Sequence, residues 1–262
     1  MKKIILGICF VFMLLMAIII IKTNDYSKNL LVVVVPHHNF VKQERLEFWD
    51  KIAKESIIDP DKIEKIIIVG PDHFGTIQTN ITYDNTGWTT YDTTLENFFK
   101  RPNYFPKNYV LNTKLVKGDH AIANLISEIH DNFPRAKFVP FIIGGKIKFK
   151  ELSPLINYID ESCIKNCLLI ASVDFSHYVT LDVANKQDEN TIKLLENKKI
   201  KENVLNQNNT IEADSPASLY IMQEFARSNN LNWKLYNHTN SARGNKETTD
   251  TTSHIFGAFI SK

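Results

Sequence analysis

Three separate apolar runs of the sequence end in histidines. They are residues 31–35 before His37 and His38, residues 65–69 before His73, and residues 168–173 before His177. Short, continuous apolar runs are typical of strands that are buried on both faces. In open α/β sheets, ligands bind beyond the carboxyl ends of the strands, where loops from different strands converge. Because histidine binds metals and carries protons near neutral pH, this placement predicts a metal site or acid–base chemistry.

Other histidines lack this placement. His130 falls within a predicted helix and His238 follows a late strand, so we interpret both as structural or surface residues. His254 begins a strand, and its role stays open. His37 and His38 offer two imidazoles that point in different directions, and their position alone does not select one of them.

The segments around these histidines alternate between strand and helix patterns. Expected strands cover residues 31–35, 65–69, 138–143, 167–173, 233–237 and 254–260, and expected helices cover residues 43–58, 119–133, 152–159, 182–196 and 215–225. In the first helix, Leu46, Trp49, Ala53 and Ile57 form the apolar face. Ser215 and Pro216 are typical of the N-cap and first residue of the last helix. This alternation predicts an α/β fold, a three-layer sandwich around a central mixed sheet.

Length and charge limit the classes of partner. A chain of 262 residues can hold one domain with a large core. Its 31 basic and 29 acidic residues are scattered, with a formal net charge of +2. Because a nucleic-acid-binding surface needs a basic stripe, we expect no nucleic acid partner.

The N-terminus has a different composition from the rest. An unbroken apolar run extends from Ile4 to Ile21, preceded by two lysines and without small residues at its end. Such a run is long enough to span a bilayer and is longer than the apolar core of most cleaved signal peptides. We expect a signal anchor at residues 1–23, a single α/β domain at residues 24–262, and a single-pass membrane protein whose C-terminal domain is extracytoplasmic.

Two cysteines follow that segment. Cys163 and Cys167 are separated by three residues at a predicted helix-to-strand turn. Two cysteines without neighbouring histidines make a poor zinc site. A disulfide and two free buried thiols both remain open.

Four segments together resemble the ordered signature of the Memo family, which includes the bacterial and archaeal proteins named AmmeMemoRadiSam system protein B. These segments are residues 36–40, 70–73, 118–122 and 172–178. The resemblance extends over about residues 31 to 260. It implies a fold shared with class III extradiol dioxygenases, which hold non-haem Fe(II) with two histidines and a carboxylate.

The resemblance also assigns roles. By position, His37 and His73 are similar to the two metal-binding histidines. His177 is similar to the acid–base histidine of the dioxygenases, with Asp174 beside it, and His120 matches a further site histidine of the Memo group.

Two departures from the family pattern affect the site. The position of a cysteine found in many members corresponds to Glu212, and Ala123 stands where an acidic residue is frequent. Glu212 or Asp214 could supply a carboxylate ligand, and we expect Glu212. The alternative is that both residues only lie at a helix N-terminus, where the helix dipole favours acidic side chains.

These observations lead to three hypotheses for the function. The first is a metal-dependent, dioxygenase-like oxidoreductase that acts on a small aromatic or otherwise activated molecule. Its metal would be Fe(II), although zinc, copper or manganese also fit such ligands. The second is a non-catalytic protein of the cell envelope that binds a metal, a peptide or a small molecule, and the third is a metal-assisted hydrolase. The sequence does not separate them.

Overall fold

The computed structural model describes residues 30–55, 57–84, 108–200, 211–243 and 248–261. Its strands are β1 (Leu30–Val35), β2 (Lys65–Pro71), β3 (Ile81–Tyr83), β4 (Tyr109–Leu111), β5 (Lys137–Ile143), β6 (Cys167–Ser172), β7 (Phe175–Val179), β8 (Ile211–Ala213), β9 (Asn232–Asn240) and β10 (Thr251–Ile260). Its α-helices are α2 (Lys42–Lys54), α4 (Thr113–Gly118), α5 (His120–Asn132), α6 (Ser153–Ser162), α7 (Leu181–Glu196) and α8 (Pro216–Ser228). Short 3-10 helices are η1 (Asn39–Val41), η2 (Pro60–Lys62) and η3 (Phe149–Leu152).

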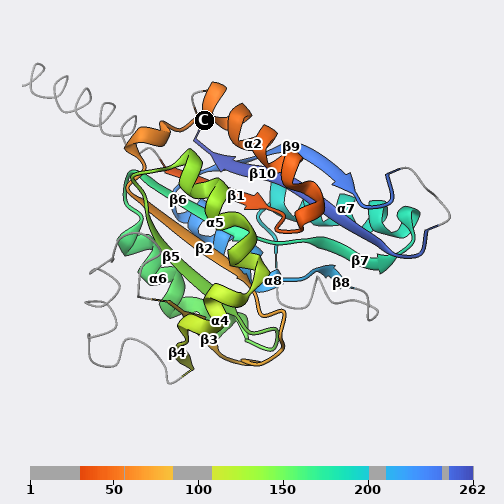
Figure 1. The fold of residues 1–262 in the computed structure, drawn as a ribbon, viewed down its shortest axis with the longest axis horizontal. Helices are drawn as coiled ribbons and strands as arrows, with labels where there is room; N and C mark the ends of the chain where they lie inside the picture. The colour runs from red at the N-terminus through yellow and green to blue at the C-terminus, as the bar shows by residue number, and fades with distance from the viewer. Residues whose placement is uncertain (1–29, 56, 85–107, 201–210, 244–247, 262) are drawn as a thin grey trace, which may run out of the picture.

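The described strands form one mixed sheet with helices around it (Figure 1). The strand order is β4-β3-β5-β2-β6-β1-β10-β7-β8, and β9 pairs with β10. The central strands β5, β2, β6 and β1 are parallel, whereas β10 runs antiparallel to β1, and β3 runs antiparallel to β5. The predicted α/β class, mixed sheet and flanking helices are therefore confirmed.

Both faces of the central strands are covered. All six residues of β1 are buried, and alternate side chains belong to different cores. Val32 and Val34 pack in one core with residues of α6 and α8, while Val33 and Val35 pack in the other with residues of α2 and α5. Burying each valine contributes roughly 1.5 kcal/mol or more, so the apolar run explains why β1 lies at the centre.

Parallel pairing brings the strand ends to one edge. Val35 at the end of β1 is in register with Ser172 at the end of β6, and Val69 of β2 is in register with Ala171. The residues that follow β1, β2 and β6 therefore leave the sheet side by side, as the first two apolar runs predict.

The third apolar run differs from the prediction. Strand β6 ends at Ser172, and Phe175 begins a new strand, β7, that pairs with β10 and β8 instead of β1. Asp174 therefore occupies the strand end, and His177 lies within β7. Of the apolar face predicted for the first helix, Trp49 is buried but Leu46 and Ala53 are exposed, and the other buried residues of α2 are Arg45, Phe48 and Ile52.

The predicted localisation, a single-pass membrane protein with an extracytoplasmic domain, is contradicted. Among the helices that the structure describes, none is long and apolar enough to cross a bilayer. The apolar run from Ile4 to Ile21 and the anchor predicted at residues 1–23 lie outside the described residues.

A disulfide joins Cys163, which follows α6, to Cys167, the first residue of β6. Their Cα atoms are 5.3 Å apart, and both residues are buried. Of the two alternatives that the spacing left open, the structure contains the bridge.

Candidate metal centre

His37 follows β1, and a hydrogen bond at Nδ1 fixes the orientation of its ring. Its Nδ1 lies 3.0 Å from the Ser172 hydroxyl, which donates its own hydrogen to the Ala121 carbonyl at 2.6 Å. Since a serine hydroxyl has one hydrogen, Ser172 must accept from His37 Nδ1–H. The neutral ring then presents the lone pair of Nε2 to the site.

Buried Arg45 holds the backbone of the same segment. Its guanidinium donates to the carbonyls of Pro36 and His38, at 3.2 and 2.7 Å, and makes two hydrogen bonds of 2.8 Å to the buried Glu128 carboxylate. The Asn124 side chain donates to the His37 carbonyl at 3.0 Å. Helices α2 and α5 thus hold the loop that carries His37.

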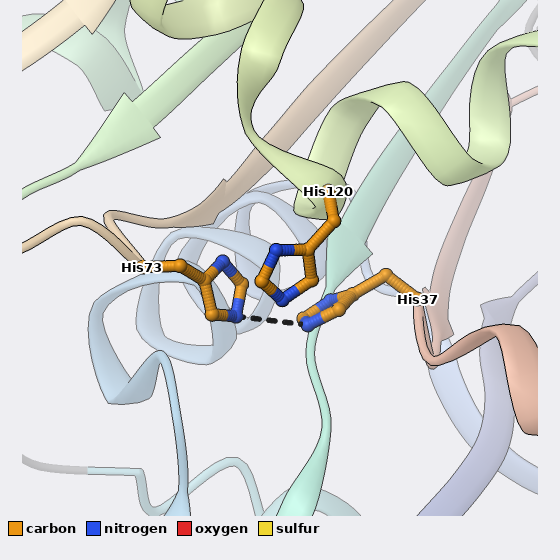
Figure 2. A group of neighbouring side chains, drawn as sticks. All are labelled: His37, His73 and His120. Carbon is orange, nitrogen blue, oxygen red and sulfur yellow. Dashed lines mark hydrogen bonds between the residues drawn. The ribbon is translucent and has the colours of Figure 1, made fainter.

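His73 is oriented by an equivalent contact. Its Nδ1 lies 2.7 Å from Asp119 Oδ1, and its backbone N–H donates to Asp119 Oδ2 at 3.0 Å. Asp119 is buried and also caps α5 by accepting from the Ala121 N–H. The neutral ring therefore presents Nε2, which lies 3.1 Å from His37 Nε2 (Figure 2).

Two carboxylates converge on the same nitrogens. Asp214 Oδ2 is 3.2 Å from His37 Nε2 and 3.7 Å from His73 Nε2, and Asp174 Oδ2 is 3.2 Å from His37 Nε2. Asp174 lies between β6 and β7, and Asp214 lies between β8 and α8. The Asp174 N–H donates to the Asp214 carboxylate at 3.3 Å, so this hydrogen bond links the β6–β7 segment to the β8–α8 segment.

His120 adds a third imidazole. As the first residue of α5, it places its ring centroid 3.5 Å from that of His73 and 5.3 Å from that of His37 (Figure 2). The described residues contain two groups whose donor atoms lie within 4.8 Å of one another: His37 with His73 and His120, and His37 with Asp174 and Asp214. Both groups could hold a metal ion, and His37 belongs to both.

The charges of the cluster compensate one another. Burial disfavours the charged form of both histidines, but the adjacent carboxylates outweigh it, raising the pKa of His37 and raising the pKa of His73 to about 9. Burial also opposes ionisation of Asp214, yet His37 and His73 lower its pKa, whereas burial raises the pKa of Asp174. Without a cation, protons on the histidines balance the carboxylate charge.

Burial and neighbouring charge keep His120 neutral. Burial lowers the pKa of His120 to about 4, with a further contribution from His73 and His37. A neutral ring beside two histidines that favour the protonated form is available as a metal ligand or hydrogen-bond partner.

The structure does not bring Glu212 to these histidines. Glu212 lies on β8, and its carboxyl has a pKa raised by burial and by the charge of Asp188. One of its oxygens is buried without a hydrogen-bond partner among the described residues. The carboxylate beside His37 and His73 is that of Asp214, two residues later, where β8 has ended and α8 has not begun.

His177 lies near the cluster but outside both donor groups. Its Nδ1 is buried and has no hydrogen-bond partner in the described part of the chain. Burial lowers the pKa of His177, although Asp214 and Asp174 act in the opposite direction. Asp174, expected beside His177, makes its closest contact with His37 instead.

Three residues of the site were missed in the sequence. Asp119 stands in the Gly118–Ile122 segment next to His120 but had no role there, and Ser172 is the last residue of a strand. Arg45 carried a signal that helical spacing could have revealed: it lies four residues before Trp49, so it faces the core despite its charge.

The described residues form an α/β protein with a candidate metal-binding cluster of imidazoles and carboxylates at the carboxyl ends of its strands. The fold is similar to the crystal structure of an uncharacterized protein from Escherichia coli K12, with a TM-score of 0.53 and 13% sequence identity over 87% of this chain and 99% of that one. At this identity the likeness shows the fold alone. No curated protein matches the chain.

The family follows from the sequence itself. The family model described as Memo-like protein matches residues 13–255. The chain therefore belongs to the Memo-like protein family, and the resemblance drawn from the four histidine-containing segments is confirmed.

Proposed function

We propose that the protein binds one divalent transition metal ion through His37 Nε2, His73 Nε2 and the Asp214 carboxylate, and that it is a metal-dependent oxidoreductase. The observation that carries this proposal is the convergence of two imidazole nitrogens and a carboxylate oxygen, 3.1 to 3.7 Å apart. Both imidazoles are held from behind, by Ser172 and Asp119.

The two separations from His37 Nε2, 3.1 Å to His73 Nε2 and 3.2 Å to Asp214 Oδ2, fit donors that share one ion, and the 3.7 Å between His73 Nε2 and Asp214 Oδ2 is slightly longer. With bond lengths of about 2.1 Å, two ligands that subtend 90° to 109° at a metal lie about 3.0 to 3.4 Å apart. Hydrogen bonds from the far nitrogen of a ligating histidine to a carboxylate or another acceptor are typical of metal sites. The donor set therefore fits a metal after a small movement of the Asp214 carboxylate toward His73, without rearrangement of either ring.

The type of donor favours iron. Two histidines and one carboxylate with open positions are the ligands of non-haem Fe(II) oxygenases, although zinc, copper or manganese could also be bound. A metal bound there would polarise a substrate oxygen and bind molecular oxygen. This proposal replaces Glu212 by Asp214 as the carboxylate ligand.

The remaining residues would handle protons and orientation. His177 favours its neutral form, so it can accept a proton from a hydroxyl of the substrate and return it later. Asp174 lies between His37 and the start of β7, where its raised pKa lets it share a proton with the cluster. His120, neutral and with its ring tilted beside that of His73, can donate or accept a hydrogen bond.

Metal analysis with a matched pair of variants tests the ligand set. Asp214→Asn should lower the metal content of the purified protein at least about tenfold, because an amide is a weaker ligand than a carboxylate. Glu212→Gln should leave it unchanged, since that carboxyl interacts with Asp188 instead. Loss of metal from the Glu212 variant alone would overturn the proposal.

Oxygen consumption then separates the kinds of function. The iron-loaded protein should consume oxygen in the presence of one or more members of a catechol panel. Tight metal binding without oxygen consumption would favour a non-catalytic metal- or ligand-binding protein. Hydrolysis of an activated ester that depends on the metal would favour a metal-assisted hydrolase.

A further inference from the structure

A cavity of about 660 Å³ opens beside the candidate metal centre. His73 and Asp214 line one end of it, and the loop from Gly144 to Phe149 lines another part, together with the first residues of α8. A volume of this size is typical of sites for small molecules. Nothing in the proposed metal ligation uses the loop.

The loop is fixed to the segment that follows His73. The Gly144 N–H donates to the Asn80 carbonyl and the Lys146 N–H donates to the Gln78 carbonyl, both at 2.9 Å. A Cβ at position 144 would lie 2.2 Å from the Gln78 carbonyl oxygen, so only glycine permits this approach. The backbone of Lys146 is therefore held at a defined place relative to the metal centre.

The acidic groups of the cavity are already engaged. Asp72 accepts from the backbone N–H groups of Phe74 and Ile77, at 3.2 and 2.8 Å, and Asp214 lies against the two histidines. By contrast, Lys146 makes no ion pair with any residue that the structure describes. The cavity thus has the candidate metal ligands on one side and, on the loop, the ammonium group of Lys146, which pairs with no described carboxylate.

Apolar residues make up about half of the cavity lining. They include Ile143, Ile147, Phe149, Pro216 and Ala217. The ring of Phe149 stacks on that of Tyr220 with centroids 4.4 Å apart, which fixes this wall. A ligand with an apolar body and polar ends therefore matches the lining.

We infer that the substrate is a small carboxylate with an apolar body, bound with its carboxylate at Lys146 and its other end toward His73 and Asp214. This inference rests on the proposed function, because it requires a metal at those residues. An ion pair with an exposed, flexible lysine contributes little binding free energy, because both charges stay hydrated. The charge of Lys146 therefore determines which ligands are preferred, and the apolar walls supply most of the affinity.

Two probes that differ in one group test the inference. The hydroxamate of para-carboxybenzohydroxamate chelates the metal, and para-carbamoylbenzohydroxamate is the neutral equivalent. Calorimetry on the full-length Zn(II)-loaded protein measures binding without oxidation of the metal. We expect the carboxylate probe to bind about two- to fivefold more tightly than the amide, as for an exposed ion pair.

Charge reversal locates the contact. Lys146→Glu should weaken binding of the carboxylate probe about fivefold or more and leave the amide probe within about twofold. Lys150→Glu is the matched control: Lys150 is exposed on η3 and does not line the cavity, so both affinities should stay unchanged.

The outcomes distinguish the inference from the function on which it rests. If the wild type fails to hold zinc, the proposed metal site is wrong. If zinc is held but the carboxylate and amide probes bind equally, or if Lys150→Glu weakens the carboxylate probe as much as Lys146→Glu does, the inference about the substrate is wrong and the metal site stands.

Discussion

The two sides of the candidate site differ in how their polar groups are held. On the side of β1 and β2, the far nitrogens of His37 and His73 are bound by Ser172 and Asp119. On the side of β7 and β10, His177 Nδ1 and both ring nitrogens of His254 are buried without hydrogen-bond partners among the described residues. One side is built and oriented, and the other contains buried nitrogens that no described group satisfies.

This difference separates two tasks. A ligand must be held in place before the metal arrives, and hydrogen bonds from behind achieve that at both histidines. An unsatisfied buried polar group costs about 1 to 3 kcal/mol, so groups of this kind are most common where a substrate, water or proton completes them. We therefore interpret the β1 and β2 side as the metal-binding side, and the β7 and β10 side as the one that exchanges protons with the site.

The largest expected effect comes from breaking the support of the oriented side. Arg45→Met should lower the free energy of unfolding by about 3 to 5 kcal/mol, because it leaves the buried Glu128 carboxylate without its partner. Urea denaturation measures this change, with Arg135→Met, an exposed arginine, as the control. The double variant Arg45→Met with Glu128→Leu should recover much of the loss. An Arg45 variant as stable as the wild type would show that this support is dispensable.

The next effect concerns ring orientation. Asp119→Ser keeps a residue that can cap α5 but removes the carboxylate that holds His73 Nδ1, so metal affinity should fall about 10- to 100-fold. Competition with a chelator measures the affinity. The control is Asp131→Ser on the same helix, where the side chain is 82% exposed. Equal metal affinities for the two variants would show that Asp119 does not orient the His73 ring for metal binding.

The oriented side was also the part that the sequence predicted best. The runs at Leu31–Val35 and Lys65–Val69 are continuous, apolar and bounded by proline or glycine, so local pattern alone indicates buried parallel strands. The histidines that follow them then had to meet at one edge. The family resemblance selected His37 over His38, which the position alone could not do.

The other side depends on non-local pairing that no local pattern contains. The apolar run through Val173 gave no sign that β6 ends at Ser172 and that β7 changes its partner to β10. The carboxylate prediction depended on the family position of a cysteine, which selected Glu212, whereas the carboxylate beside His37 and His73 is that of Asp214, two residues later. A difference of two residues thus decides which side chain lies beside the histidines.

The pH dependence of metal affinity tests whether the metal displaces a proton from His73. In the metal-free protein, the hydrogen bond to Asp119 and the charge of Asp214 outweigh burial and raise the pKa of His73 to about 9. The metal needs the neutral ring, so below that pKa it must displace a proton. Measured affinity should therefore rise about tenfold per pH unit for each proton displaced, from pH 6.5 toward 9, and then level off. Calorimetry in buffers of different ionisation enthalpy counts the protons, and a pH-independent affinity would contradict the exchange.

The smallest expected effect on metal binding belongs to the other side, at His177. It lies on β7, outside both donor groups, and burial lowers its pKa, which favours the neutral base that we propose for it. His177→Ala should leave metal content within about twofold of the wild type while reducing turnover roughly 100-fold or more, the usual contribution of a positioned acid–base group. His130→Ala, at an exposed position on α5, is the matched control and should change neither quantity. Because the variant separates metal binding from turnover, loss of metal would place His177 among the ligands, and unchanged turnover would assign the proton transfer to another group, with the buried Asp174 and His254 as alternatives.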